Sequence, residues 1–129
     1  MSKPLALIVE DDPDAATIFS KALQAAGFET EVAWAGDLAL NRLKSIKPGV
    51  IVVDMHLPNV AGPIILNKIR EDPRLAKAHI IITTADARMA EAAQEPNDYV
   101  FLKPISFSQL RDLALRLRSS TDSDANYHS

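Results

Sequence analysis

The chain has 129 residues, of which 47% are hydrophobic, and this is enough to bury the core of one domain. Its 14 basic and 17 acidic residues give a net charge of -3, which argues against a direct role in nucleic-acid binding. The lack of cysteine excludes disulfides and thiolate metal sites and fits the reducing cytoplasm.

Short strand patterns alternate with longer helical patterns along the chain. The β-branched or alternating runs that predict strands are, in chain order, 5–10, 28–35, 50–53, 79–85 and 98–104. The segments with helical spacing of apolar residues are 13–26, 37–47, 63–71, 86–95 and the segment from 106 onward. Asp12-Pro13 suits the start of the first helix and Gly27 its end, while SFSQ at 106–109 is a capping box.

The order of these elements predicts a doubly wound α/β domain over residues 1–120. Runs of Ile and Val suit parallel strands that are buried on both faces, with helices on either side of the sheet. The first apolar run, LALIV, is too short for a signal peptide or a membrane span. Residues 121–129 lack apolar periodicity, so we expect a disordered polar tail.

Several polar residues follow directly after the predicted strands. Asp54 ends the third strand, Glu10-Asp11-Asp12 end the first, Thr83-Thr84 end the fourth and Lys103 follows the fifth. Taken alone, each acid is explained as a helix cap or a solvated residue, Thr84 as an ordinary strand-end residue and Lys103 as a solvated side chain. Because the carboxyl ends of parallel strands meet at one edge of a sheet, we expect these residues to come together.

Such a group of carboxylates predicts a cation site. Like charges a few ångströms apart repel by about 4 kcal/mol per pair near a protein surface, so the acids need a cation or a proton. Oxygen ligands without cysteine favour a hard ion, and few protein ligands favour Mg²⁺ over Ca²⁺. A metal and a lysine beside an ionised carboxylate suit phosphoryl transfer to that carboxylate.

Four motifs resemble the receiver domains of bacterial two-component response regulators. They are VEDD at 9–12, VDMHLP at 53–58 with Gly62 eight residues after Asp54, ITTA at 82–85 and LKP at 102–104. The resemblance covers about residues 4–118 and implies a flavodoxin-like fold, a five-stranded parallel sheet in the order 2-1-3-4-5.

The resemblance also implies a role for each matching residue. Asp54 is similar to the phosphoacceptor, Lys103 to the lysine that contacts the phosphoryl group and Thr84 to the switch hydroxyl. Asp11 and Glu10 resemble the acids that bind Mg²⁺.

Two further positions have expected roles beside that acid group. The backbone carbonyl of His56, and not its ring, is expected to complete the metal site. Asp12 is expected to cap a helix.

The same resemblance implies a signalling domain and not a turnover enzyme. It accepts a phosphoryl group from a histidine kinase or a histidine phosphotransfer protein, loses it slowly, and changes the face formed by the fourth helix, fifth strand and fifth helix. A downstream protein would bind that face, and a homodimer is compatible with it; neither nucleic acid nor membrane is an expected direct partner. Whether the chain stands alone or belongs to a longer regulator stays open.

Two features depart from the family pattern. The aromatic residue expected three positions before the lysine is replaced by Val100, and Tyr99 lies one position earlier, which points it to the opposite face of an unbulged strand. The interval from Thr84 to Lys103 spans 19 positions, about one helical turn less than usual, and Pro96 stands where a glycine normally ends the fourth helix. We therefore expect a short or mobile fourth helix.

Two alternatives remain open from the sequence. A degenerate receiver would bind partners without phosphorylation, which the altered fifth strand favours and the complete acid group disfavours. A phosphatase of the haloacid dehalogenase type also uses an aspartate nucleophile with Mg²⁺, but such enzymes need a second Asp where this chain has His56.

Overall fold

A computed structural model describes residues 3–92 and 98–127 of the chain. The elements in chain order are β1 (Leu5–Val9), α1 (Pro13–Ala25), β2 (Glu29–Ala33), α2 (Gly36–Leu43), β3 (Val50–Asp54), α3 (Gly62–Glu71), the 3₁₀ turn η1 (Pro73–Leu75), β4 (His79–Thr84), α4 (Ala87–Ala92), β5 (Asp98–Leu102) and α5 (Phe107–Tyr127). This alternation confirms the predicted α/β class. None of the described helices is long and apolar enough to cross a membrane.

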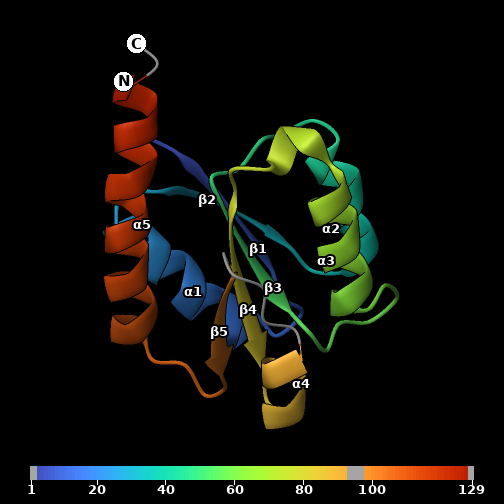
Figure 1. Ribbon diagram of the computed structural model, residues 1–129. Helices are drawn as coiled ribbons and strands as arrows, with labels where there is room; N and C mark the ends of the chain where they lie inside the picture. Colours follow the sequence, from blue (N-terminus) through green and yellow to red (C-terminus); the bar gives the residue numbers. More distant parts are fainter. Residues whose placement is uncertain (1–2, 93–97, 128–129) are drawn as a thin grey trace.

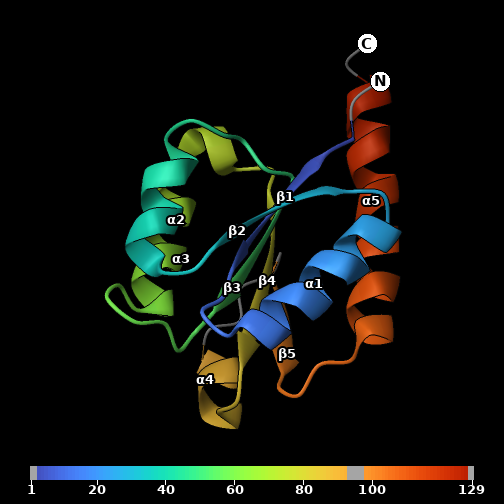
Figure 2. The same ribbon diagram turned by 180° about the vertical axis from the view of Figure 1, so that it is seen from behind.

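The five strands form one parallel sheet in the order β2-β1-β3-β4-β5, as predicted. Helices α1 and α5 cover one face, and α2 and α3 cover the other, while α4 lies at the carboxyl ends of the strands (Figure 1). Figure 2 shows the molecule from behind, where α1 crosses in front of the sheet and lies beside α5. The chain adds β2 on one side of β1 and then β3 on the other side. Such a change in the direction of strand addition opens a crevice at the carboxyl ends of β1 and β3.

Alternate residues of each strand point to the two faces and build two cores. The core under α1 and α5 takes Ala6, Ile8, Val50, Val52 and Ile81 from the strands. The core under α2 and α3 takes Leu7, Val9, Ile51, Val53, Ile80 and Ile82. The face of any residue near a strand end therefore follows from its position in the alternation.

The predicted start of the last helix is confirmed in detail. Ser106 Oγ accepts a hydrogen bond from the Gln109 N–H at 3.1 Å, and Gln109 Oε1 accepts one from the Ser106 N–H at 3.0 Å. This reciprocal pair is the capping box that the sequence indicates. The helix then buries its apolar stripe against α1: Leu110, Leu113, Ala114 and Leu117.

Helix α2 is shorter than the predicted span of 37–47, because it ends at Leu43. The N–H groups of Lys44 and Ser45 bond to carbonyls three residues back, so the chain tightens into a turn. Pro48 also disfavours helical conformation in the residue before it. The apolar spacing continues past the point at which the backbone leaves the helix.

The end of the chain also differs from the expectation. Helix α5 continues to Tyr127, whereas the sequence predicts a disordered tail over 121–129. A helix that is already nucleated gains one hydrogen bond for each residue added, which weakly helical residues can exploit. Residues 128–129 lie outside the described part of the chain.

The expected fourth helix over 86–95 begins as predicted. Helix α4 is described over Ala87–Ala92, while 93–95 and Pro96 lie outside the described residues. The shortness of this helix, its mobility and the role of Pro96 therefore stay predictions.

Candidate functional site

Three carboxylates meet at the carboxyl edge of the sheet. Strands β1 and β3 are neighbours, with Val9 paired to Val53, so the residues that follow them lie side by side. Ligand oxygens of Glu10, Asp11 and Asp54 all lie within 4.8 Å of one another. Asp11 is exposed, whereas only 1% of Glu10 and 3% of Asp54 is accessible to solvent. The predicted acid group is thus formed, and two of its members are buried.

Lys103 joins this group from the end of β5, an edge strand of the sheet. Its Nζ donates to Glu10 Oε1 at 2.7 Å and to Asp54 Oδ2 at 3.0 Å. Its backbone N–H donates to the carbonyl of Thr84 at 2.7 Å, which extends the pairing of β4 with β5 and fixes where the side chain begins. The sequence predicts that Lys103 lies near Asp54, and the structure adds its bond to Glu10.

The strand alternation explains why these side chains converge. Glu10 continues the face of Ile8, and Asp54 continues the face of Val52, both of which lie in the core under α1 and α5. Lys103 continues the face of Phe101, which packs against the same core. Three strands therefore aim their last polar residues at one point.

Burial dominates the electrostatics of Glu10. Desolvation, reinforced by the neighbouring Asp54, raises the pKa of Glu10 to about 7, although its hydrogen bond with Lys103 acts in the opposite direction. Burial acts to lower the pKa of Lys103, but the hydrogen bonds to Glu10 and Asp54 outweigh it, so this pKa is raised. One ammonium therefore leaves the acids short of positive charge, and this condition favours a bound cation.

Gly62 explains why the motif places a glycine eight residues after Asp54. A Cβ at Gly62 would lie 2.6 Å from the carbonyl oxygen of Asp54 and 2.6 Å from Cα of Met55, closer than real Cβ contacts come. The first turn of α3 thus rests directly on the backbone that carries Asp54. The glycine allows this close approach.

Thr84 is buried but points away from the acids. Its Oγ1 accepts a hydrogen bond from the Asp86 N–H at 3.0 Å and lies 3.3 Å from Nε2 of His56. Thr84 continues the face of Ile82, under α2 and α3, which is opposite to the face of Asp54. Within the described part of the chain no hydrogen bond links the Thr84 hydroxyl to Asp54.

His56 contacts both halves of the site. Its backbone N–H donates to Asp54 Oδ1 at 3.0 Å, and its exposed ring lies beside Thr84. The ring lies outside the group of carboxylates. The expected role of the His56 carbonyl as a metal ligand stays a prediction.

The expected cap and the expected departure in the fifth strand are both present. Asp12 Oδ1 accepts from the Asp14 N–H at 3.3 Å at the start of α1. Tyr99 packs on the α1–α5 side against the ring of His79, at 6.3 Å between centroids, whereas Val100 packs on the α2–α3 side. The pairing of β4 with β5 is continuous over the strand, so the one-residue offset does turn Tyr99 away from the face of Thr84.

The sequence places both Thr83 and Thr84 at the end of the fourth strand but assigns a role only to Thr84, whereas the structure pairs Thr83 directly with Asp54. The Thr83 hydroxyl is buried, yet it has no hydrogen-bond partner among the described residues. The sequence shows two consecutive threonines at the end of β4, and only the three-dimensional structure separates their environments.

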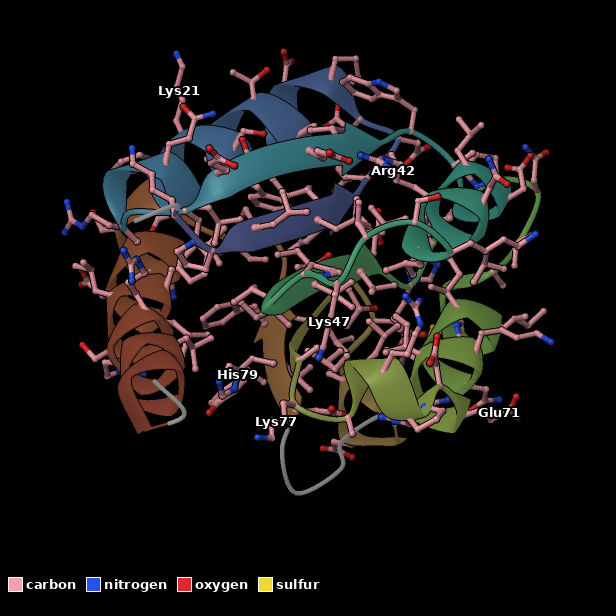
Figure 3. The ribbon with its side chains drawn as sticks, turned by 90° about the horizontal axis from the view of Figure 1, so that it is seen from above. Lys21, Arg42, Lys47, Glu71, Lys77 and His79 are labelled. Atoms are coloured by element: carbon pink, nitrogen blue, oxygen red, sulfur yellow. The ribbon has the colours of Figure 1, made fainter. Side chains whose placement is uncertain are left out.

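The two ends of the sheet differ in their charges. Acids gather at the carboxyl end, and Figure 3 looks onto the opposite, amino end, where Lys47 and Lys77 extend outward near His79. Among the described residues, the carboxylates that could hold a metal ion lie together at the carboxyl end.

Comparison with known proteins agrees with this geometry. Residues 6–115 match the response regulator receiver domain. The phosphate regulon transcriptional regulatory protein PhoB of Rhizobium meliloti is 32% identical over 111 residues, which cover 83% of this chain and 48% of PhoB. The transcriptional regulatory protein TrcR of Mycobacterium tuberculosis is 32% identical over 115 residues, which cover 87% of this chain and 43% of TrcR. The chain thus spans about half the length of these relatives.

Solved structures share the fold. The signal receiver domain of a signal transduction histidine kinase from Syntrophus aciditrophicus superimposes with a TM-score of 0.78 at 26% identity, covering 91% of both chains. The chemotaxis response regulator CheY4 of Vibrio cholerae has a TM-score of 0.78 at 22% identity, covering 90% of this chain and 99% of CheY4. The family match covers residues 6–115 and agrees with the acid group and lysine at the carboxyl edge of the sheet. The chain therefore belongs to the family of response regulator receiver domains.

Proposed function

We propose that the chain is a phosphoacceptor switch in which Asp54 receives a phosphoryl group. The observation that carries this proposal is the position of Asp54. It is a buried carboxylate with two other carboxylates within 4.8 Å and with Lys103 Nζ 3.0 Å from its Oδ2. This arrangement combines a nucleophile, a cation-binding group and a movable positive charge.

The reaction is a direct transfer between two proteins. A carboxylate oxygen of Asp54 attacks the phosphorus of a phosphohistidine, the O–P bond forms as the P–N bond breaks, and the leaving imidazole keeps the bonding electron pair and takes a proton from water. The His56 N–H holds Oδ1 and orients the carboxylate. Lys103 turns from the carboxylate to the phosphoryl oxygens and stabilises their charge.

The acid group fits Mg²⁺. Three clustered carboxylates with no sulfur or imidazole ligand among them match the oxygen ligands that this hard ion prefers. Glu10, Asp11 and Asp54 would hold the ion, and the carbonyl of His56 would complete the protein ligands. When bound, Mg²⁺ neutralises charge on the phosphoryl oxygens.

Thr84 links the reaction to α4. Its hydroxyl turns toward the phosphoryl group and gives up its present contact with the Asp86 N–H. Asp86 starts α4, because its carbonyl accepts from the Ala90 N–H and its Oδ1 accepts from the Arg88 N–H at 2.9 Å. A movement of Thr84 therefore acts on the first turn of α4.

The exposed surface provides places for the two expected partners. Ile18, Pro104 and Ile105 line a cavity of about 390 Å³ that also reaches Lys103, and we assign this apolar hollow to the histidine kinase or phosphotransfer protein. The output partner is a protein that binds the α4–β5–α5 face, where the side chain of Leu102 is half exposed. The domain acts in the cytoplasm through protein contacts.

A receiver that binds partners without phosphorylation is the second candidate. The observation in its favour is Val100, because an aliphatic side chain lies on the face of Thr84 where the family pattern places an aromatic one. The acid group and its lysine favour the phosphoacceptor.

Experiments with small phosphoryl donors distinguish the phosphoacceptor switch from the phosphorylation-independent receiver and from a phosphatase. With Mg²⁺ and phosphoramidate, whose P–N bond resembles that of phosphohistidine, the chain should take up one phosphoryl group and lose it only slowly. It should not turn over p-nitrophenyl phosphate. Continued hydrolysis of that phosphomonoester would instead support an aspartate-nucleophile phosphatase, and no uptake by a folded chain would support the phosphorylation-independent receiver.

A further inference from the structure

Thr83 holds a buried hydroxyl that the proposed function does not use. Only 1% of the residue is accessible to solvent, and Oγ1 has no hydrogen-bond partner among the described residues. Buried polar groups are nearly always paired, because an unpaired one loses its bonds to water without replacement. Valine has almost the same shape as threonine and would avoid this loss.

The position of Thr83 beside Asp54 is fixed by the sheet. The two residues are paired in register across β3 and β4, and the Met55 N–H donates to the Thr83 carbonyl at 2.9 Å. Thr83 continues the face of Ile81, just as Asp54 continues the face of Val52, and both faces lie under α1 and α5. The hydroxyl and the carboxylate therefore extend side by side from strands about 4.8 Å apart.

The carboxylate of Asp54 loses one donor when the site acts. In the resting structure Oδ1 accepts from the His56 N–H and Oδ2 accepts from Lys103 Nζ. The proposed function moves Lys103 to the phosphoryl group, and this movement leaves Oδ2 without its present donor. Thr83 lies directly across from Asp54 in the pairing of β3 with β4, and its hydroxyl has no hydrogen-bond partner among the described residues.

We propose that Thr83 is a positioning residue for Asp54. Its hydroxyl donates a hydrogen bond to the Asp54 side chain once Lys103 has turned away, and it holds that side chain in the orientation needed for in-line attack. The inference rests on the proposed function and adds to it a residue on the face opposite to Thr84. The unpaired hydroxyl of the resting state is then a group kept ready for the phosphorylated state.

The melting temperature and the rate of phosphorylation together distinguish a positioning role of Thr83 from a role in packing alone. Thr83→Val removes an unpaired buried hydroxyl, so the melting temperature of the unphosphorylated chain should rise by a few degrees. The same variant loses one hydrogen bond in the transfer, so its rate of phosphorylation by acetyl phosphate with Mg²⁺ should fall by about threefold to tenfold. A packing residue would not change these two quantities in opposite directions.

Thr83→Ser tests whether the hydroxyl itself is responsible. Serine keeps the donor and loses only a methyl group, so its phosphorylation rate should stay within about twofold of the wild type although its melting temperature falls. Intact mass over time gives the rates, and calorimetry before and after phosphorylation gives the melting temperatures. The rise in melting temperature on phosphorylation should be smaller for Thr83→Val than for wild type.

Each other result would overturn the inference in a distinguishable way. If Thr83→Val is phosphorylated as fast as the wild type, the hydroxyl has no part in positioning, while the proposed function stands. If Thr83→Val melts at a lower temperature, the hydroxyl is paired in the resting state and is not held ready. If the folded wild type takes up no phosphoryl group, the proposed function fails and this inference fails with it.

Discussion

Nε2 of His56 lies 3.3 Å from Oγ1 of Thr84, and this contact holds the hydroxyl on the side of β4 away from Asp54. The Asp86 N–H is the second group that contacts this hydroxyl. A rotation of the Thr84 side chain toward a phosphoryl group on Asp54 would break both contacts. The contacts with His56 and Asp86 therefore restrain the hydroxyl that the proposed switch would move.

Replacing the ring nitrogen should ease this step. His56→Phe keeps a ring of similar size and the backbone N–H to Asp54, but it removes the contact with Thr84. Phosphorylation by acetyl phosphate should become faster by about twofold to fivefold, the value of one weak hydrogen bond. His79→Phe, at the amino end of β4, is the matched control and should leave the rate unchanged. An equal or slower rate in His56→Phe would show that this contact does not restrain Thr84.

The raised pKa of Glu10 predicts an unusual dependence of stability on pH. Between its ordinary value of 4.5 and about 7, Glu10 binds a proton more tightly in the folded chain than in the unfolded one. The free energy of unfolding without Mg²⁺ should therefore fall as pH rises through this range, by up to about 3 kcal/mol.

Glu10→Gln is the variant that tests this dependence. It should remove the slope and be more stable than wild type at pH 8, as measured by urea unfolding in the presence of a chelator. Glu71→Gln, an exposed acid far from the site, should keep the slope. The same slope in Glu10→Gln as in wild type would show that another group causes it.

Mg²⁺ should reverse this loss of stability. A cation that binds only the folded acid group raises the melting temperature increasingly as its concentration exceeds the dissociation constant. Asp11→Asn removes one exposed anionic ligand, so the Mg²⁺ affinity from a calorimetric titration should fall by about tenfold or more, equivalent to about 1.4 kcal/mol. Asp14→Asn, in the first turn of α1, should bind Mg²⁺ as wild type does. Equal affinities in both variants would place the ion elsewhere.

Removing Lys103 should destabilise the chain most at alkaline pH. Lys103→Met leaves Glu10 and Asp54 without their ammonium partner, and because Lys103 is partly exposed we expect a loss of about 2 kcal/mol at pH 8. The loss should shrink at pH 5, where Glu10 is protonated and carries no charge. Lys21→Met, on α1 and at the molecular surface in Figure 3, is the control and should change little at either pH. An equal loss of stability at both pH values would show that the contribution of Lys103 does not depend on the protonation of Glu10.

The sequence is sufficient to predict the sheet and the acid group. Runs such as Val50–Val53 and Ile80–Ile82 are continuous because both faces of a parallel strand are buried. The carboxyl ends of such strands must meet at one edge, so the order of the strands and helices along the chain already places Asp54, Glu10 and Lys103 together.

The features that the sequence could not supply depend on packing between distant residues. The bond from Lys103 to Glu10 joins positions 93 residues apart and needs the exact length of both side chains. The side to which the Thr84 hydroxyl turns depends on a contact with a loop residue, His56. Thr83 and Thr84 are the same residue type, and only the structure shows that the Thr83 hydroxyl is buried without a partner among the described residues while the Thr84 hydroxyl contacts His56.

The most direct test of the account is the intact mass of the chain after incubation with acetyl phosphate, with and without Mg²⁺. Wild type and Asp37→Asn, a control acid in α2, should each gain one phosphoryl group only when Mg²⁺ is present. Asp54→Asn should gain none, because it lacks the attacking carboxylate. No gain by the folded wild type, or an equal gain by Asp54→Asn, would contradict the assignment of Asp54 as the phosphoacceptor.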